Sequence, residues 1–307
     1  MKLAAIGECM LELSGKVSGN ATNTAPMSMS FGGDTLNTLV YAARLGIDSY
    51  FFSALGTDAY SDWLLARWKD EGVNTQFVHR IANKLPGMYA IELDERGERS
   101  FYYWRKDSAA SAYVSELGEQ RLFSQLLQMD VIYLSGISLG ILDKPQRETL
   151  LQIIAKLKAA GKCIAFDGNY RPRNWSSKEE AQTYISKMLN LSDWYLPTLD
   201  DEQLLFDCDT KDDVCRLHAH HKISTLVVKD GENGCYIYEQ SSSQRADPIH
   251  VPIPNKVTPV DTTAAGDSFN AGFIAALMQQ QSAQEAALSG HIVAARVIQH
   301  RGAIIPR

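Results

Sequence analysis

The 307-residue sequence lacks the features that mark several large classes of protein. No apolar run approaches the roughly 20 residues that a transmembrane helix needs. The segment Met1–Glu8 carries an acidic residue too early for a signal-peptide core, so it predicts a first strand instead. Lysine and arginine are scattered and the net charge is −6, which predicts no basic groove for nucleic acid. We therefore expect a cytoplasmic protein with neither a membrane nor a nucleic-acid partner.

Two nucleotide-binding motifs and the usual metal-binding spacings are also missing. The sequence contains no G-x-x-x-x-G-K-[ST] and no G-x-G-x-x-G, which argues against a P-loop or a dinucleotide-binding domain. The five cysteines form no C-x-x-C pair, so we expect reduced thiols. The histidines of segment 218–221 have no matching cysteine or carboxylate spacing, and we expect a solvated helix end there rather than a metal site.

Short apolar runs alternate with amphipathic helical patterns over most of the chain. This alternation is typical of an α/β fold with a mostly parallel sheet flanked by helices. The expected strands are Leu3–Ile6, Ser49–Leu55, Val131–Leu134, Cys163–Phe166, Trp194–Leu196, Thr225–Val228 and Cys235–Tyr238. The expected helices are Thr35–Leu45, Tyr60–Lys69, Arg147–Ala160, Ala181–Leu191, Asp267–Met278 and Ala283–Gln299.

The segment 86–106 breaks this alternation and reads as a strand, a turn at Asp94–Glu98 and a second strand. Together with segment 9–31 it could form a small β-sheet separate from the main layer. Such an inserted sheet suits a lid over a cleft, and an ordinary edge hairpin is the alternative. The exposed edge of a lid sheet would also allow pairing with a second copy of the chain.

The stretch Val260–Phe273 is the most informative part of the sequence. It joins an extended segment to a helix through Ala264, Ala265 and Gly266, whose small side chains let a phosphate approach the backbone. Free N–H groups at the start of a helix favour an anion. Asp267 follows in the first turn, where it could act as a general base toward a hydroxyl. The pattern predicts phosphoryl transfer from a nucleotide to an alcohol.

A second motif, Phe31–Thr38, places a Gly-Gly turn before a helix. Gly33 would let backbone and ligand meet closely. Asp34 and Asn37 lie one helical turn apart, so both could face a cleft and bind sugar hydroxyls. The alternative is that Asp34 only caps the helix.

These two motifs resemble the signatures of the ribokinase-like (PfkB) carbohydrate kinases. The C-terminal signature, D-T-x-G-A-G-D, is matched with Ala264 in place of the first glycine. The N-terminal signature, G-G-x-x-x-N followed by A-x-x-L-G, is matched at its second part by Ala42–Gly46, and the usual G-x-D follows at Gly56–Asp58. The resemblance implies one ribokinase-like kinase domain over residues 1–307, with a β lid from the two segments above. It also implies that ATP phosphorylates a sugar.

A third motif, Asp167–Trp175, follows an apolar strand, where ligands of open α/β sheets gather. It resembles D-x-N-x-R-x-x-L-W, shared by 2-keto-3-deoxygluconate kinases and some fructokinases, with Asn174 in place of leucine. Arg171 could bind a substrate carboxylate, which a guanidinium fork matches well, or it could contact the transferring phosphate.

Tyr89, Tyr103 and Arg105 look like the 2-keto-3-deoxygluconate kinase subgroup, in which the lid tyrosine and arginine bind the keto acid. If Arg171 serves the phosphate, Arg105 alone carries the argument for an acid sugar. The residues expected to bind the substrate are Gly33, Asp34, Asn37, Tyr89, Tyr103, Arg105, Arg171 and Asp267. Those expected in catalysis are Asp267, the Ala264–Gly266 loop and Arg171.

The segment Val227–Cys235 reads as a strand, a G-x-x-G turn and a second strand. Alone it indicates a plain hairpin, but beside the anion loop it resembles the nucleotide shelf of the family. The resemblance then implies that ATP contacts Asn169, Lys229, Gly231, Gly234, Ala264 and Gly266.

The N-x-x-E motif, which many members link to magnesium, is absent. Thr198 stands at its asparagine position and Asp201 at its glutamate position. Asp201 or Glu202 could still serve Mg²⁺, which accepts carboxylates while keeping most of its waters, and the sequence does not choose between them. The resemblance also implies a monovalent cation near Asp261 and Thr263.

The interpretation that follows is phosphorylation of 2-keto-3-deoxygluconate to the 6-phosphate by ATP and Mg²⁺, with Asp267 as general base. Two alternatives stay open. One is a kinase for a neutral sugar such as fructose or ribose, and the other is a sugar-binding sensor without turnover.

Overall fold

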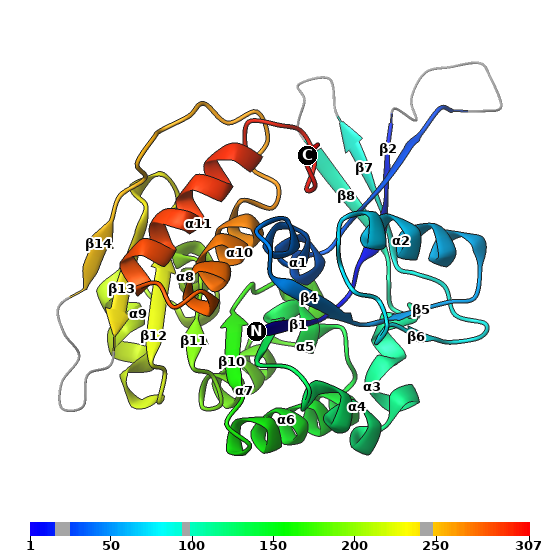
Figure 1. The fold of residues 1–307 in the computed structure, drawn as a ribbon, viewed down its shortest axis with the longest axis horizontal. Coiled ribbons are helices and arrows are strands. Elements are labelled where there is room, and N and C mark those ends of the chain that lie inside the picture. Colours follow the sequence, from blue (N-terminus) through cyan, green and yellow to red (C-terminus); the bar gives the residue numbers. More distant parts are fainter. Residues whose placement is uncertain (16–24, 94–98, 240–247) are drawn as a thin grey trace.

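The computed structural model describes residues 1–15, 25–93, 99–239 and 248–307. Its largest sheet has eight strands in the order β14-β13-β12-β11-β10-β9-β1-β4 (Figure 1). The strands from β4 to β12 in this order are parallel, and β13 and β14 join antiparallel at one edge. Their bounds are β1 Lys2–Ile6, β4 Asp48–Phe52, β9 Val131–Ser135, β10 Cys163–Asp167, β11 Trp194–Tyr195, β12 Thr225–Lys229, β13 Cys235–Glu239 and β14 Ile249–Val251.

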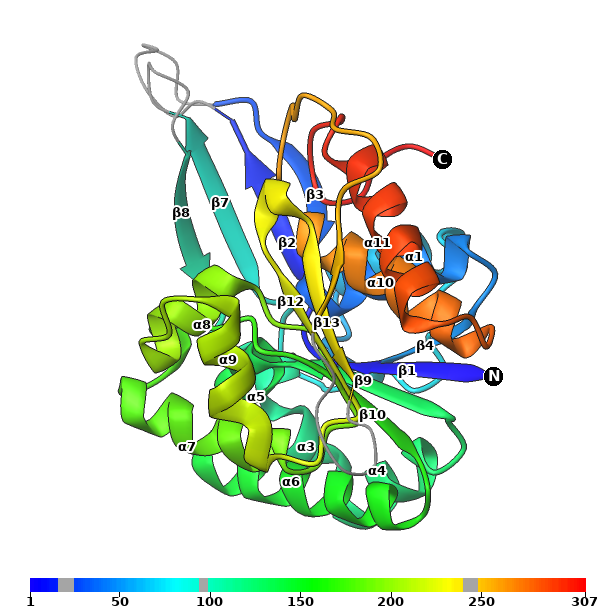
Figure 2. The same cartoon turned by 90° about the vertical axis from the view of Figure 1, so that its left-hand side faces the viewer.

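Helices cover both faces of this sheet, which confirms the predicted fold class (Figure 2). Alternate side chains of β1 enter two separate cores: Ala4 and Ile6 pack with α4, α6 and α7, and Leu3 and Ala5 pack with α1, α10 and α11. The two-residue period of a strand accounts for this division. The helices are α1 Asp34–Arg44, α2 Ala59–Asp70, α3 Tyr113–Leu117, α4 Glu119–Leu126, α5 Gly136–Gly140, α6 Lys144–Ala159, α7 Lys178–Leu189, α8 Leu199–Phe206, α9 Lys211–Leu217, α10 Ala265–Met278 and α11 Ala283–Val297.

A four-stranded sheet stands apart from the large one, in the order β3-β2-β7-β8 (Figure 2). Its strands are β2 Met10–Ser14, β3 Ser28–Gly32, β7 Met88–Leu93 and β8 Arg99–Trp104. The predicted small sheet is therefore present, and the alternative of an ordinary edge hairpin is wrong because β7 pairs with β2 as well as β8. The expected turn at Asp94–Glu98 lies outside the described residues.

Two local expectations need correction. The expected strand Ser49–Leu55 divides, because Ala54 and Leu55 form a short strand, β5, that pairs with β6 (His79–Arg80) instead of continuing in the large sheet. The expected solvated helix end at 218–221 is wrong for His218 and His221, which are both buried. His218 Nε2 lies 2.7 Å from Glu202 Oε2, and His221 Nδ1 lies 2.8 Å from Asn190 Oδ1. In the described parts of the chain, no helix is both long and apolar enough to span a bilayer.

Candidate active site

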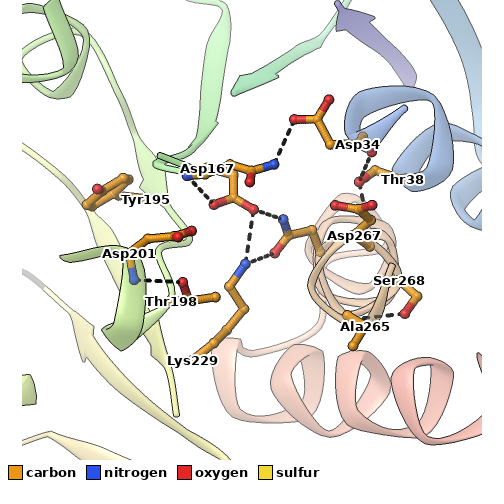
Figure 3. A network of polar contacts seen from close by, with 12 residues as sticks. Asp34, Thr38, Asp167, Tyr195, Thr198, Asp201, Lys229, Ala265, Asp267 and Ser268 are labelled. Carbon is orange, nitrogen blue, oxygen red and sulfur yellow. Dashed lines mark hydrogen bonds and ion pairs between the residues drawn. The ribbon is translucent and has the colours of Figure 1, made fainter. Parts of the chain in front are cut away.

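The predicted residues converge at the carboxyl ends of the parallel strands, beside the start of α10 (Figure 3). Asp167 is the last residue of β10 and Lys229 the last of β12. Parallel strands bring their carboxyl ends to one edge of the sheet, so polar residues far apart in sequence meet there. The carboxylates of Asp34, Asp167, Asp201 and Asp267 all lie in this region (Figure 3).

The anion loop ends in a left-handed residue. Ala264, the N-cap of α10, has φ 60° and ψ 18°. The Ala265 N–H donates to Thr262 O at 3.2 Å, and helical bonding begins with Ser268 N–H to Ala264 O at 2.9 Å. The loop therefore uses the Ala265 amide for its own turn. The Gly266 amide, next along the helix, is left to face an anion.

The left-handed backbone at Ala264 predicts a gain in stability from Ala264→Gly. An L-residue pays about 1–2 kcal/mol in this region, and glycine pays none but loses more chain entropy on folding. We expect the free energy of unfolding to rise by about 0.5–1 kcal/mol in urea titrations. The matched control, Ala265→Gly, lies one residue on in the helix and should be neutral or destabilising. Equal effects at both positions would contradict the prediction.

Asp267 is held from α1. Asn37 Nδ2 donates to Asp267 Oδ2 at 2.8 Å, and Thr38 Oγ1 donates to the Asp267 carbonyl at 3.1 Å. Burial raises the pKa of Asp267 to about 7, with further increases from the charges of Asp34 and Asp167, while the Asn37 bond and Lys229 lower it. A carboxylate with this pKa is poised to accept a proton near neutrality.

Asp34 does not cap α1. The N-cap is Gly33, which makes no side-chain cap bond, and the Asp34 carboxylate instead accepts a hydrogen bond from Asn169 Nδ2 at 2.8 Å. A Cβ added at Gly33 would lie 2.1 Å from Glu8 O, so only glycine allows this close approach. Burial raises the pKa of Asp34, and the nearby Arg105 lowers it.

Lys229 belongs to a buried polar network. Its Nζ lies 3.0 Å from Asp167 Oδ2 and 3.0 Å from Asn270 Oδ1. Asn270 Nδ2 in turn donates to Asp167 Oδ2 at 2.6 Å and to the Tyr133 hydroxyl at 3.1 Å. An added Cβ at Gly266 would lie 3.6 Å from Lys229 Nζ, so this cation reaches the anion loop.

The two carboxylates considered for magnesium have different surroundings. Asp201 faces the site and accepts a hydrogen bond from Arg171 Nη1 at 2.8 Å. Glu202 is buried, and its two oxygens are bound by the Tyr195 hydroxyl and by His218. Consecutive residues of a helix point about 100° apart, so the two side chains face different surroundings. Asp201 thus presents its carboxylate, paired with Arg171, to the site, whereas the Glu202 oxygens are bound inside the fold.

The small sheet carries two of the expected substrate residues, Tyr89 and Tyr103, and Arg105 directly follows its strand β8. Tyr89 and Tyr103 are opposite each other in register, with ring centroids 5.9 Å apart. The Tyr89 hydroxyl donates a hydrogen bond to Glu12, so this hydroxyl is already bonded to another residue of the sheet. Arg105 follows β8 and forms an ion pair with the buried Glu8.

A cavity of about 380 Å³ opens beside α10. Nucleotide-sized sites fall in this range of volumes. Of the predicted nucleotide-binding residues, Lys229, Gly231, Gly234 and Gly266 line it, and Asn169 and Ala264 do not. Phe269 and His291 add an apolar and aromatic wall.

Sequence reasoning missed three contributors to this site: Glu8, Asn270 and the contact from Asn37 to Asp267. Asn270 lies one turn beyond Asp267 on the same helix, and that spacing was an available signal. Glu8 gave no signal, because its partner is 97 residues away in the chain.

Comparisons with known proteins agree along the whole chain. The family model described as pfkB family carbohydrate kinase matches residues 1–307. The 2-dehydro-3-deoxygluconokinase of Dickeya dadantii (strain 3937) is 44% identical over 308 residues, covering 99% of this chain and 96% of that protein. The Escherichia coli (strain K12) protein of the same name is 43% identical, with coverage of 100% and 97%. The crystal structure of a PfkB protein from Polaromonas sp. JS666 superposes with a TM-score of 0.84 at 26% identity, covering 97% of this chain and 96% of that one.

Proposed function

This chain belongs to the pfkB family of carbohydrate kinases, and we propose that it uses ATP to phosphorylate 2-keto-3-deoxygluconate, also called 2-dehydro-3-deoxygluconate. Two relatives named for this activity are 43% and 44% identical over essentially the whole chain. The observation that carries the proposal is the Asp267 carboxylate, buried at the start of α10 beside the anion loop, with its pKa raised to about 7.

In the proposed reaction Asp267 takes the proton of the primary hydroxyl of the sugar acid. The hydroxyl oxygen forms a bond to the γ-phosphorus as the bond from that phosphorus to the ADP oxygen breaks. Asn37 keeps the Asp267 carboxylate oriented through its 2.8 Å hydrogen bond. The Gly266 amide and Lys229 would oppose the negative charge that develops on the phosphoryl oxygens.

The sugar acid would lie between α1 and the small sheet. Asp34 and Asn37, following the close turn at Gly33, supply groups for hydroxyls, and Tyr89 and Tyr103 supply an aromatic wall. Arg105 would bind the substrate carboxylate, because a guanidinium offers paired donors to it. The sheet would then act as a lid, and its edge could pair with a second copy of the chain.

The nucleotide would occupy the cavity beside α10 and extend its phosphates toward Gly266 and Arg171. The described residues include no group of three or more His, Cys, Asp or Glu side chains that could hold a metal. Mg²⁺ does not need a cluster of protein ligands, because it binds largely through substrate phosphates and keeps several waters. Asp201 would hold it on the protein side, and the ion would neutralise phosphate charge.

The proposal extends to a monovalent cation beside Asp261 and Thr263. Asp261 Oδ1 accepts hydrogen bonds from the Thr263 N–H and hydroxyl at 3.0 and 2.7 Å, which organises this turn next to the anion loop. Turnover in potassium buffer, compared with tetramethylammonium buffer, tests this part. Equal rates would exclude a functional cation here.

The raised pKa of Asp267 predicts the pH dependence of the reaction. A base must be unprotonated, so kcat/KM should fall as the pH drops below about 7. The negative charge of Asp34 contributes to this raised pKa, so Asp34→Asn should move the acidic limb to lower pH. The position of the limb is compared in the two proteins, whatever their absolute rates. A limb at the same pH in both would contradict the assignment.

The first experiment measures ATP consumption by the purified protein with Mg²⁺ and 2-keto-3-deoxygluconate, fructose or ribose. A clear preference for the keto acid is expected. Preference for a neutral sugar would retain the kinase reaction but remove Arg105 from acid recognition. Sugar binding without turnover would favour a sensor.

A further inference from the structure

We propose that Glu8 is the positioning residue that makes this site selective for an acid sugar, by holding the Arg105 guanidinium in place. The inference rests on the proposed function, since it concerns how the carboxylate of that substrate is recognised. It assigns a role to a buried acidic side chain that takes no part in the phosphoryl transfer described above.

The ion pair between these residues is nearly excluded from solvent. The Glu8 side chain is 0% exposed and that of Arg105 is 14% exposed. Glu8 Oε2 accepts from Arg105 Nε at 2.8 Å and from Nη2 at 2.5 Å. Glu8 therefore occupies one edge of the guanidinium, and Nη1 with the outer hydrogen of Nη2 remains for a second anion.

Glu8 sits where the small sheet joins the rest of the molecule. It lies between the end of β1 and the start of β2, and Arg105 directly follows β8. The Glu8 backbone packs against Gly33, next to Asp34. The Glu8 Oε1 atom lies close to Gly87, where an added Cβ would be 2.7 Å from it. The pair thus links the segments that enter and leave the small sheet, immediately beside the expected sugar site.

Two further observations support this role for the pair. Burial raises the pKa of Asp34, and the positive charge of the guanidinium is near enough to offset part of that rise. Glu8 Oε1 is buried and has no hydrogen-bond partner among the described residues. A carboxylate buried with one oxygen unsatisfied is costly, and packing alone gives no reason to keep it there. Holding an arginine at a fixed place beside the substrate gives such a reason.

The pairing has two consequences for substrate choice. A long arginine side chain held at one edge loses little further freedom when it binds a second carboxylate. If the arginine is removed, Glu8 becomes an unpaired anion that repels the substrate carboxylate. The effect of removing Glu8 should therefore change sign with the residue at position 105.

The test is a double-mutant cycle on the full chain, with KM for 2-keto-3-deoxygluconate as the readout. Glu8→Ala should raise this KM by roughly tenfold in the otherwise unchanged protein. In the Arg105→Ala background the same substitution should lower it, because it removes the unpaired anion. Additive effects, or a KM that is unchanged by Glu8→Ala, would overturn the proposal.

Two more variants separate position from charge. Glu8→Asp keeps the charge but withdraws it by one methylene, so its KM for the keto acid should resemble that of Glu8→Ala. If this KM equals that of the unchanged protein, Glu8 only balances charge and the proposal is wrong. Glu8→Gln has nearly the same shape and keeps one acceptor, so it should give a smaller rise in KM and serves if Glu8→Ala does not fold. No rise with folded Glu8→Gln and Glu8→Asp would also refute the proposal.

Controls identify a merely structural effect. The KM for the methyl ester of the substrate, which has no charge to bind, and the KM for ATP should stay constant in the Glu8 variants. Glu92→Gln, on β7, where the carboxylate accepts from the Tyr102 hydroxyl at 3.0 Å, should change nothing. A parallel rise with acid and ester would show general damage to the site and overturn the inference.

The outcome for the unchanged protein separates the two proposals. If it phosphorylates the keto acid but the cycle is additive, only the role of Glu8 fails. If it does not phosphorylate the keto acid, the proposed function fails and the role of Glu8 fails with it.

Discussion

Asp267→Asn is expected to lower turnover by roughly 10²–10⁴ while leaving ligand binding nearly intact. The asparagine amide cannot take the proton of the attacking hydroxyl, but it has almost the same shape and can still bond to Asn37. Turnover is measured at saturating ATP and sugar acid, and binding by calorimetry. A rate close to that of the unchanged protein would exclude Asp267 as the base.

The same variant makes a second, independent prediction about stability. The folded protein raises the pKa of Asp267 to about 7, so it disfavours the ionised form, and this cost grows as the pH rises from about 4 to 7. Asp267→Asn removes the titration and should therefore gain stability relative to the unchanged protein over that interval.

The control for both measurements is Asp200→Asn. Asp200 is an exposed carboxylate in the first turn of α8, outside the Asp34–Asp267 region. It should leave both the turnover and the pH dependence of stability unchanged. Loss of activity in Asp267→Asn together with a loss of stability at pH 8 would indicate misfolding rather than a missing base.

Arg105→Ala should have the second-largest effect, a loss of roughly 10²-fold in kcat/KM for 2-keto-3-deoxygluconate. The variant removes charged hydrogen bonds worth about 1.5–3 kcal/mol each and exposes the substrate carboxylate to Glu8. A neutral sugar should lose much less, because it has no carboxylate to bind. The ratio of kcat/KM for the acid to that for fructose is the measurement.

Two checks accompany this variant. Glu8 becomes a buried carboxylate without its partner, which costs about 3–5 kcal/mol, so thermal unfolding must show that the protein is folded at the assay temperature. Lys106→Ala removes an exposed cation from the neighbouring position and should alter neither substrate. Equal losses with acid and neutral sugar would assign Arg105 to structure alone.

The sequence predicted the strands and the anion loop correctly because each of them is encoded within one continuous segment. The apolar runs predicted every core strand from β1 to β13 in the large sheet, because a buried parallel strand is a short apolar run. The anion loop is equally local: Val260–Phe273 contains both the small residues and the carboxylate, and α10 begins there. The family resemblance rested on such segments, and the full-length match confirmed it.

Sequence patterns predicted the structure less well where a helix is short or where one apolar run pairs with two different strands. The helices α8 and α9 have eight and seven residues, too few for a clear 3.6-residue period. The run Ser49–Leu55 is uniformly suited to a strand, so its pattern could not reveal that the last two residues pair with β6.

The pairing of the polar groups was decided only by the tertiary structure. Asn37 meets Asp267 across 230 residues, Asn169 meets Asp34 across 135, and Arg105 meets Glu8 across 97. The sequence determined the fold family and the kinds of chemical group at the site. The folded sheet determined which of these groups form hydrogen bonds or ion pairs with one another. Such contacts act only over a few ångströms, and the parallel strands bring residues that are distant in the sequence to one edge.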